Sequence, residues 1–286
     1  MISMPPVVSS RGRCSTAHAG RRIFAASLKH RGFPMLRSLP RQLAVIALAT
    51  VIGACAGNGS RSKADVEHAV QTNLGLAQSY MGKGDFEAAL DKLRKAEALN
   101  PRSPQTQSML GMLYERIGRP ELSGPFYEKS VSLAPNDGAM LNNYATWLCR
   151  SKRSADSLTW FDRALNDPFY KTRAMAYGNA GRCAVEAGLL ERAEGYFRGA
   201  LEIDPNFTDV LQDMASLSLQ RGDYLRARAF VQRREALGPV GPVLLDIAAH
   251  VEDGRGDQEA AQRYRRQLLE QFPEYQSALP GNNKKP

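Results

Sequence analysis

The sequence contains little histidine, little cysteine and no long apolar run, and each scarcity excludes a class of protein. Only four of the 286 residues are His and four are Cys, which argues against a small fold held together by many disulfides. No stretch reaches the roughly 18 apolar residues that a membrane-spanning helix requires, so we expect no polytopic membrane protein. With 43% hydrophobic residues, the chain has enough apolar side chains for an ordinary globular core.

The net charge of +9 is concentrated at the start of the chain. Residues 1–54 contain eight of the 38 Lys and Arg residues and no Asp or Glu, which leaves 30 basic and 29 acidic residues in 55–286. A nucleic-acid-binding domain normally carries its positive charge on its folded part. We therefore expect no nucleic acid among the partners.

Signatures of catalysis are also missing. The sequence has neither a Gly-rich phosphate loop nor a nucleophile-elbow pattern. After residue 54 the only histidines are His68 and His250, which are too far apart in sequence to suggest a catalytic triad or a metal cluster. The expectation is a protein that is not an enzyme and that holds no metal or other cofactor.

The sequence predicts a targeting signal over residues 35–54. A short basic segment precedes a ten-residue apolar run, 43–52, an order that is typical of a secretory signal peptide. Its end, Ile-Gly-Ala-Cys at 52–55, resembles the lipobox of bacterial lipoproteins. The resemblance implies cleavage before Cys55 and covalent diacylglycerol and acyl lipid on that residue. An ordinary cleaved signal followed by a chance cysteine is the alternative.

The lipobox resemblance also implies a location. Ala56, rather than Asp, follows the cysteine, which in bacterial lipoproteins implies the periplasmic face of the outer membrane of a Gram-negative bacterium. We expect translation to start at Met35, so that residues 1–34 are an extension without function. Residues 55–69 are interpreted as the lipidated cysteine and a flexible tether, and residues 276–286 as a polar tail.

The rest of the chain is repetitive. Prolines are separated by 34, 33, 37, 34 and 34 residues, at Pro101, Pro135, Pro168, Pro205, Pro239 and Pro273. Glycines recur in the middle of each unit, and Lys152 occupies the one place where the glycine is missing. This period resembles the tetratricopeptide repeat, a pair of antiparallel helices. The prediction is an all-α tetratricopeptide-repeat superhelical solenoid of about six helix pairs over residues 70–275, with an insertion near 166–169.

Small residues at fixed places support this prediction. Gly111 and Gly181 fall at the eighth place of their units, where a small side chain lets the two helices of a pair cross closely. Glycine at the turn between helices supplies the positive φ, and proline ends the second helix.

Two cysteines fall on neighbouring first helices of the predicted repeats. Cys149 belongs to the third unit and Cys183 to the fourth. In an oxidising periplasm such a pair forms a disulfide readily. The alternative is that the two residues are buried thiols filling the seams between helices.

Polar residues in the same two units are candidates for binding. Asn142 and Thr146 are expected to point into a concave groove, with Asn143 beside them and with Asn179 and Arg182 at similar places in the next unit. Side-chain amides and a guanidinium could bind a peptide backbone or a carboxylate. Alternatively, Asn143 and Asn179, both at the sixth place, satisfy backbone groups between repeats.

The segment from Asn142 to Cys149, together with the lipobox and the repeats, resembles the PilF/PilW family of type IV pilus biogenesis lipoproteins. Members are outer-membrane pilotins: they bind secretin subunits and promote their outer-membrane localisation and multimerisation, which twitching motility requires. The resemblance implies a secretin subunit and outer-membrane lipid as partners, and we expect a monomer. A repeat-containing scaffold for peptidoglycan hydrolases or for outer-membrane protein assembly is the alternative function.

Overall fold

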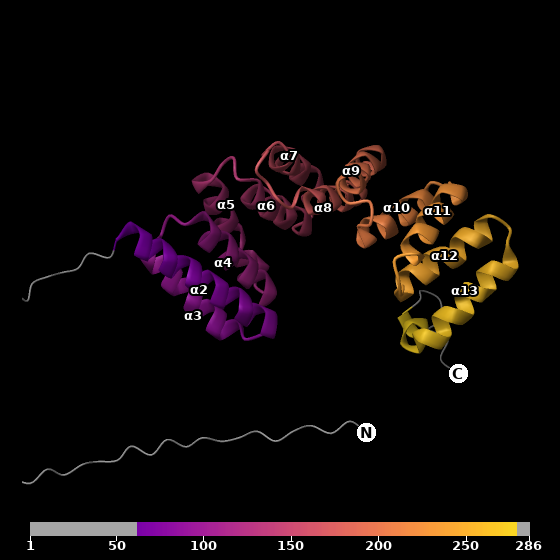
Figure 1. Ribbon diagram of the computed structural model, residues 1–286, viewed down its shortest axis with the longest axis horizontal. Coiled ribbons are helices and arrows are strands. Elements are labelled where there is room, and N and C mark those ends of the chain that lie inside the picture. The colour runs from indigo at the N-terminus through magenta and orange to yellow at the C-terminus, as the bar shows by residue number, and fades with distance from the viewer. Residues whose placement is uncertain (1–61, 279–286) are drawn as a thin grey trace, which may run out of the picture. The chain divides into compact units, whose positions relative to one another are not determined.

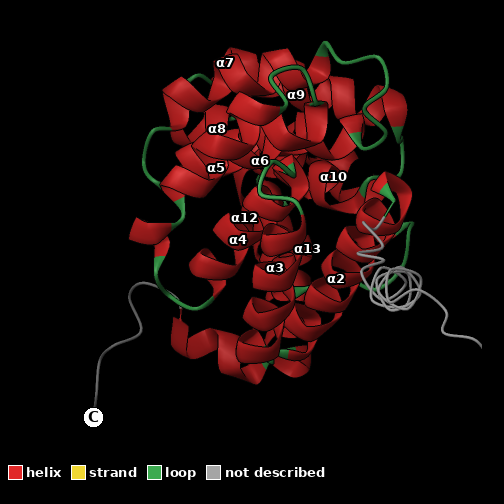
Figure 2. Ribbon diagram, turned by 90° about the vertical axis from the view of Figure 1, so that its left-hand side faces the viewer, coloured by secondary structure: helices red, strands yellow, loops and turns green. Residues whose placement is uncertain are grey.

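The computed structural model describes residues 62–278, which fold into helices joined by short loops (Figure 1). Within this range there are twelve α-helices, two short 3-10 helices and no strand (Figure 2). The α-helices are α2 (Lys63–Lys83), α3 (Phe86–Leu99), α4 (Pro104–Arg116), α5 (Gly124–Leu133), α6 (Gly138–Arg150), α7 (Ser154–Leu165), α8 (Arg173–Glu186), α9 (Leu190–Ile203), α10 (Thr208–Gln220), α11 (Tyr224–Glu235), α12 (Pro242–Gly254) and α13 (Gln258–Gln271). The 3-10 helices are η2 (Pro120–Leu122) and η3 (Pro273–Ala278).

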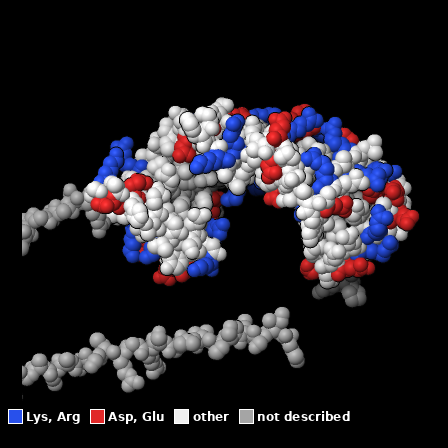
Figure 3. All heavy atoms as spheres, in the orientation of Figure 1, with Lys and Arg blue, Asp and Glu red and all other residues white. Residues whose placement is uncertain are grey.

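Consecutive helices pack as six antiparallel pairs, from α2/α3 to α12/α13. This arrangement confirms the predicted all-α tetratricopeptide-repeat solenoid and its number of units. The first helices α4, α6, α8 and α10 also contact one another in sequence order. The six helix pairs of residues 62–278 bend around a hollow, which is visible in the space-filling view (Figure 3).

The first helices of successive pairs run in the same direction. Ser108 and Glu115 of α4 contact Asn143 and Arg150 of α6, each 35 residues further along the chain. Because both ends of α4 meet the corresponding ends of α6, the two helices are parallel. All first helices therefore begin at one side of the solenoid, which we call the start edge, and end at the opposite side, the turn edge.

Glycine allows the two helices of a pair to approach closely, as the sequence predicts. A Cβ atom on Gly111 would lie 2.9 Å from the Tyr127 ring, and one on Gly181 would overlap the Phe197 ring. Tyr127 and Phe197 are almost fully buried, at 2% and 1% exposed. The aromatic ring of the second helix thus occupies the volume that a side chain on the first helix would need.

The turn between the helices of a pair requires left-handed backbone. Five repeats use glycine there, with φ between 71° and 80°, for example 75° at Gly188. Lys152 replaces glycine in the third unit and still adopts φ 63°. The repeat geometry therefore imposes on a lysine a backbone conformation that favours glycine.

The predicted boundary of the tether is wrong. Helix α2 starts at Lys63, seven residues before the predicted start of the repeats at residue 70. Ser62 caps this helix through a reciprocal capping box with Asp65, whose carboxylate accepts from the Ser62 backbone N–H. A short polar segment that resembles a linker therefore carries a helix-start signal.

The predicted extension (1–34), the signal peptide (35–54), the lipidation site Cys55 and the first residues of the tether lie outside the described residues. At the other end, η3 (Pro273–Ala278) reaches three residues into the predicted tail. Among residues 62–278, no helix is both long enough and apolar enough to cross a membrane.

Candidate binding groove

A continuous chain of side-chain hydrogen bonds crosses four consecutive first helices on the hollow side. Arg182 on α8 donates to Asp213 on α10 at 2.8 Å and to the Asn179 side-chain oxygen at 3.1 Å. The Asn179 amide donates to the Asn142 oxygen on α6 at 3.2 Å. Asn142 donates to Asn143 at 3.3 Å, and Asn143 donates to Ser108 Oγ on α4 at 2.9 Å. We call these six residues the amide ladder.

The hydrogen bonds of the amide ladder between Arg182 and Ser108 all have the same donor-to-acceptor direction, which leads away from the guanidinium. Aligned hydrogen bonds in a partly desolvated site polarise one another and strengthen. Asn142 is 6% exposed and Ser108 is 1% exposed, so the ladder forms part of the floor of the hollow. The ladder therefore fixes the relative position of four repeats through polar contacts.

The ladder contains four of the five residues that the sequence analysis proposed as groove residues. Asn142, Asn143, Asn179 and Arg182 contact one another in this chain. Thr146 lies one turn further along α6 and donates to the Asn142 backbone oxygen at 2.8 Å. The alternative, in which Asn143 and Asn179 satisfy backbone groups between repeats, is wrong, because both amides donate to side chains.

Above the ladder lies a groove of about 630 Å³. Four of the five proposed residues border it directly with part of their surface, namely Asn142, Asn143, Thr146 and Asn179. The remaining lining alternates apolar and charged side chains from α4, α5, α6 and α8, including Met112, Arg116, Tyr127, Arg150 and Met175. A second hollow of about 490 Å³ shares Met112, Arg116 and Asn143 with the first and continues it toward α2.

Methionine dominates the apolar surface of these two hollows. Five of the six methionines between residues 62 and 278 line one or both: Met81, Met109, Met112, Met140 and Met175. Methionine is unbranched and polarisable, so a surface rich in it can adapt to ligand side chains of different shape. The groove is thus suited to hold apolar side chains of a peptide above a polar floor.

Charged groups at the wall of the groove are organised around Glu115. The Tyr127 hydroxyl donates to Glu115 Oε2 at 2.7 Å, and Arg150 lies 3.5 Å from the same oxygen. Burial of the ring and the adjacent carboxylate raise the pKa of Tyr127 well above its usual value, so it stays a donor. Arg116, by contrast, is exposed and has no carboxylate within ion-pair distance among the described residues.

The far end of the ladder is partly desolvated. Burial raises the pKa of Asp213 above its usual range, and the ion pair with Arg182 opposes that shift. Asp213 and Ser108 were not among the groove residues predicted from the sequence. Asp213 was detectable, because it occupies the sixth place of the fifth unit, as Asn143 and Asn179 do in theirs.

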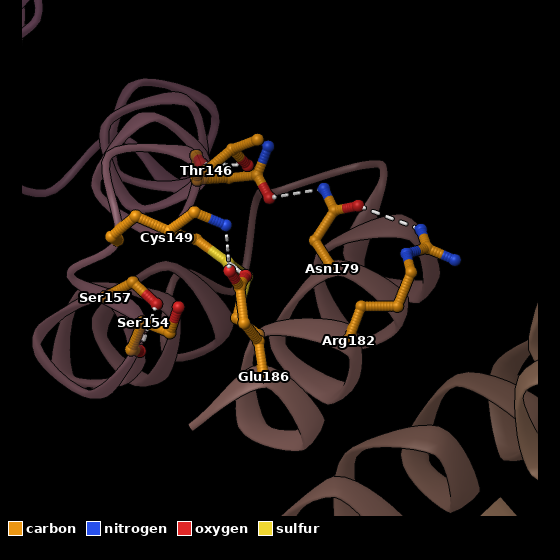
Figure 4. Close-up of a disulfide and its surroundings, with 10 residues drawn as sticks. Thr146, Cys149, Ser154, Ser157, Asn179, Arg182 and Glu186 are labelled. Atoms are coloured by element: carbon orange, nitrogen blue, oxygen red, sulfur yellow. Dashed lines mark hydrogen bonds and ion pairs between the residues drawn. A yellow bond between two sulfur atoms is a disulfide. The ribbon is translucent and has the colours of Figure 1, made fainter. Parts of the chain in front are cut away.

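A disulfide joins α6 to α8 beside the ladder. Cys149 and Cys183 are bonded, with their Cα atoms 5.8 Å apart, as expected for two residues separated by one repeat of 34. Figure 4 shows Glu186 beside the sulfur atoms, with Asn179 and Arg182 further along the same helix. Lys152 donates to Glu186 at 2.8 Å, which adds an ion pair between the same two repeats.

Neither histidine of the described chain belongs to the groove. His68 on α2 and His250 on α12 are exposed, and the His250 ring contacts the Asp246 backbone oxygen of its own helix. Residues 62–278 contain no group of three or more His, Cys, Asp or Glu side chains that could hold a metal ion.

Comparison with known proteins agrees with this architecture. Two family models, both described as tetratricopeptide repeat, match residues 74–138 and 174–207. Type IV pilus assembly protein PilF of Pseudomonas aeruginosa is 25% identical over 243 residues, which cover 82% of this chain and 96% of PilF. An uncharacterised protein of Haemophilus influenzae is 28% identical over 156 residues, 54% of this chain and 87% of that protein.

Solved structures point the same way. The structure of PilW, described as a widely conserved type IV pilus biogenesis factor, matches with a TM-score of 0.68 at 25% identity, over 71% of this chain and 94% of PilW. The chain is a PilF/PilW-like tetratricopeptide-repeat protein. The structure of Pseudomonas aeruginosa PilF matches with a TM-score of 0.67 at 24% identity, over 75% of this chain and 99% of PilF, and shows the same fold.

Proposed function

We propose that this protein acts in type IV pilus biogenesis as an outer-membrane lipoprotein pilotin. In this proposal the groove above the amide ladder binds a segment of a secretin subunit. Lipid on Cys55 holds the complex at the outer membrane, where the subunits multimerise. The likeness to PilF and PilW over most of the chain supports the role in pilus biogenesis, and the groove supports a peptide-like ligand.

The composition of the groove is the main support for this proposal. Its methionines offer apolar contacts to side chains of a bound segment, and the exposed guanidinium of Arg116 offers a donor to a carbonyl or carboxylate. Each residue of the amide ladder below already forms a hydrogen bond within the protein, which favours a floor that stays rigid when a segment binds. A preorganised groove loses little entropy on binding.

Because the protein would be attached to the membrane, the groove needs only a modest affinity for the secretin segment to hold it there. Several acyl chains on Cys55 would bind the protein to the bilayer durably. A partner captured by the groove is then held near the same membrane, which raises its local concentration for multimerisation. We propose that the protein contributes binding and localisation and no chemistry of its own, since its described histidines are isolated on the surface.

Deletion of the gene tests the proposed function. We expect heat-resistant secretin multimers to disappear from the outer membrane, with secretin monomer left in the inner membrane. Unchanged multimers, combined with a weakened cell envelope, would contradict the pilotin role and favour the alternative scaffold for peptidoglycan hydrolases or outer-membrane protein assembly.

Complementation of that deletion separates the groove from the anchor. Thr146→Tyr places a ring in the groove without removing a member of the ladder, and should fail to restore multimers. Ser132→Tyr adds the same ring at an exposed position of α5 and should restore them. Cys55→Ser removes the proposed lipid and should leave secretin away from the outer membrane, although its groove is intact.

A further inference from the structure

An aromatic side chain stands out from the start edge of the solenoid. Phe169 is 88% exposed, the highest value among the large hydrophobic residues in the described chain that face solvent. It belongs to the loop 166–172 between α7 and α8, where the repeat period lengthens from 34 to 37 residues. The groove above the ladder does not include this loop.

The loop holds Phe169 in a defined position. Asp167 accepts hydrogen bonds from the backbone N–H of Phe169 and of Gly138, both at 2.9 Å. The next residue, Tyr170, is 9% exposed and packs against Gly138 at the start of α6. Asp167 and Tyr170 thus hold the loop on either side of Phe169, and the exposure of the Phe169 ring is a property of the fold.

The chain enters the solenoid at this same edge. Helix α2 is a first helix and contacts α4 on the hollow side, so its start at Lys63 shares the start edge with the start of α8. Cys55 precedes Ser62 by seven residues, and seven residues span at most about 25 Å. A lipid on Cys55 would therefore hold Ser62, at this edge, within about 25 Å of the bilayer surface.

Exposed charge at the start edge is mostly positive around Phe169, whereas the first turn of α2 also exposes Asp65 and Glu67. Lys63, Arg102, Arg163 and Lys171 are exposed there. The carboxylates of the neighbouring loops point inward: Asp137 caps α6, and Asp167 binds the two backbone N–H groups described above. Among the described residues, no carboxylate lies within ion-pair distance of Arg102 or Lys171. An exposed aromatic ring flanked by lysine and arginine is the pattern of a surface that binds anionic lipid.

We propose that the start edge, with Phe169 at its tip and Lys171 two residues further along the same loop, is a second membrane contact that binds anionic phospholipid. Phe169 enters the interfacial region of the bilayer, and the basic side chains bind lipid phosphates. The solenoid is thereby oriented with its turn edge away from the membrane. The inference rests on the proposed lipid anchor for its geometry, but the contact itself involves described residues only.

Vesicle co-sedimentation tests the contact without the anchor. The probe is the chain from Cys55 onward carrying Cys55→Ser, mixed with phosphatidylcholine vesicles that contain or lack one quarter phosphatidylglycerol. We expect binding to the anionic vesicles only. Phe169→Ser should lower the partition coefficient by about tenfold, because the buried apolar area of one ring is lost. Lys171→Glu should lower it by a similar factor, and added salt should abolish the difference.

Leu225 provides the matched control. This residue is 73% exposed on α11, directly after the turn from α10, and so lies at the turn edge. Leu225→Ser should leave vesicle binding unchanged. Equal losses for Phe169→Ser and Leu225→Ser, or no binding to either kind of vesicle, would overturn the proposed contact, and the latter would favour a protein partner for Phe169.

Failure of this contact is distinguishable from failure of the anchor. Radiolabelled palmitate should be incorporated into the full-length protein and not into its Cys55→Ser variant, whatever the vesicles show. Labelling of Cys55 without vesicle binding would leave the pilotin proposal standing and refute the start-edge contact.

Discussion

Removal of one amide from the ladder should destabilise the protein measurably. In Asn179→Ala, the Asn142 side-chain oxygen loses the donor that the structure provides at 3.2 Å. Asn142 is 6% exposed, and an unsatisfied buried acceptor costs about 1–3 kcal/mol. Alanine favours the helix over asparagine by up to about 0.7 kcal/mol, which offsets part of the loss. We expect the free energy of unfolding to fall by about 1–2 kcal/mol.

Urea unfolding followed by tryptophan fluorescence measures this loss. The two tryptophans are Trp147 on α6, the helix that carries Asn142, and Trp160 on α7, which packs against α6. Asn73→Ala is the control, because the Asn73 amide donates only within its own helix, to Ala69, and we expect a change below about 0.5 kcal/mol.

A double-mutant cycle makes the test specific to the bond. Because Asn142→Ala removes the acceptor itself, the double variant of Asn142 and Asn179 should lose clearly less than the sum of the two single losses. Additive losses, or an Asn179→Ala variant as stable as the unsubstituted protein, would refute the ladder as a coupled network.

Three further substitutions test the packing of the repeats. Removing the disulfide by Cys149→Ala with Cys183→Ala should lower the free energy of unfolding by about 3–4 kcal/mol, since a loop of about 34 residues is no longer closed in the unfolded chain; an unchanged denaturation midpoint would contradict this. Gly181→Ala should cost about 1–3 kcal/mol through overlap with the facing ring, whereas Gly195→Ala, which meets no neighbour, should cost nothing in the same urea titration. Lys152→Gly should raise the free energy of unfolding by about 0.5–1 kcal/mol, because glycine adopts positive φ without strain and the lost ion pair is exposed; a lower thermal midpoint would show that the lysine is not strained.

The repeat architecture was predictable because its constraints are local. A proline, a turn glycine and a small residue facing an aromatic ring each leave a mark at a fixed place in every unit. The sequence also shows that Lys152 replaces the turn glycine in the third unit. Its φ of 63° shows that the repeat geometry imposes a left-handed backbone even on a residue that disfavours it. The start of α2 was predicted seven residues too late because the cap at Ser62 lies outside the repeat pattern.

The groove was only partly predictable. Asn142, Asn143, Asn179 and Arg182 could be assigned to one surface from helical periodicity, since neighbouring first helices are parallel. Their mutual hydrogen bonding could not be predicted, because it depends on side-chain rotamers across a superhelical interface. The role of Asp213 depends on burial as well, which raises its pKa and which a repeat pattern does not specify.

Site-specific photocrosslinking in living cells tests the central claim most directly. A photoreactive phenylalanine at position 146 places the reactive group in the groove, and one at position 132 places it on the exposed face of α5. With irradiation, position 146 should give a crosslinked band that a secretin antibody recognises, and position 132 should not. A secretin crosslink at position 132 alone, or at neither position while the deletion still abolishes multimers, would contradict the assignment of the groove as the secretin-binding site.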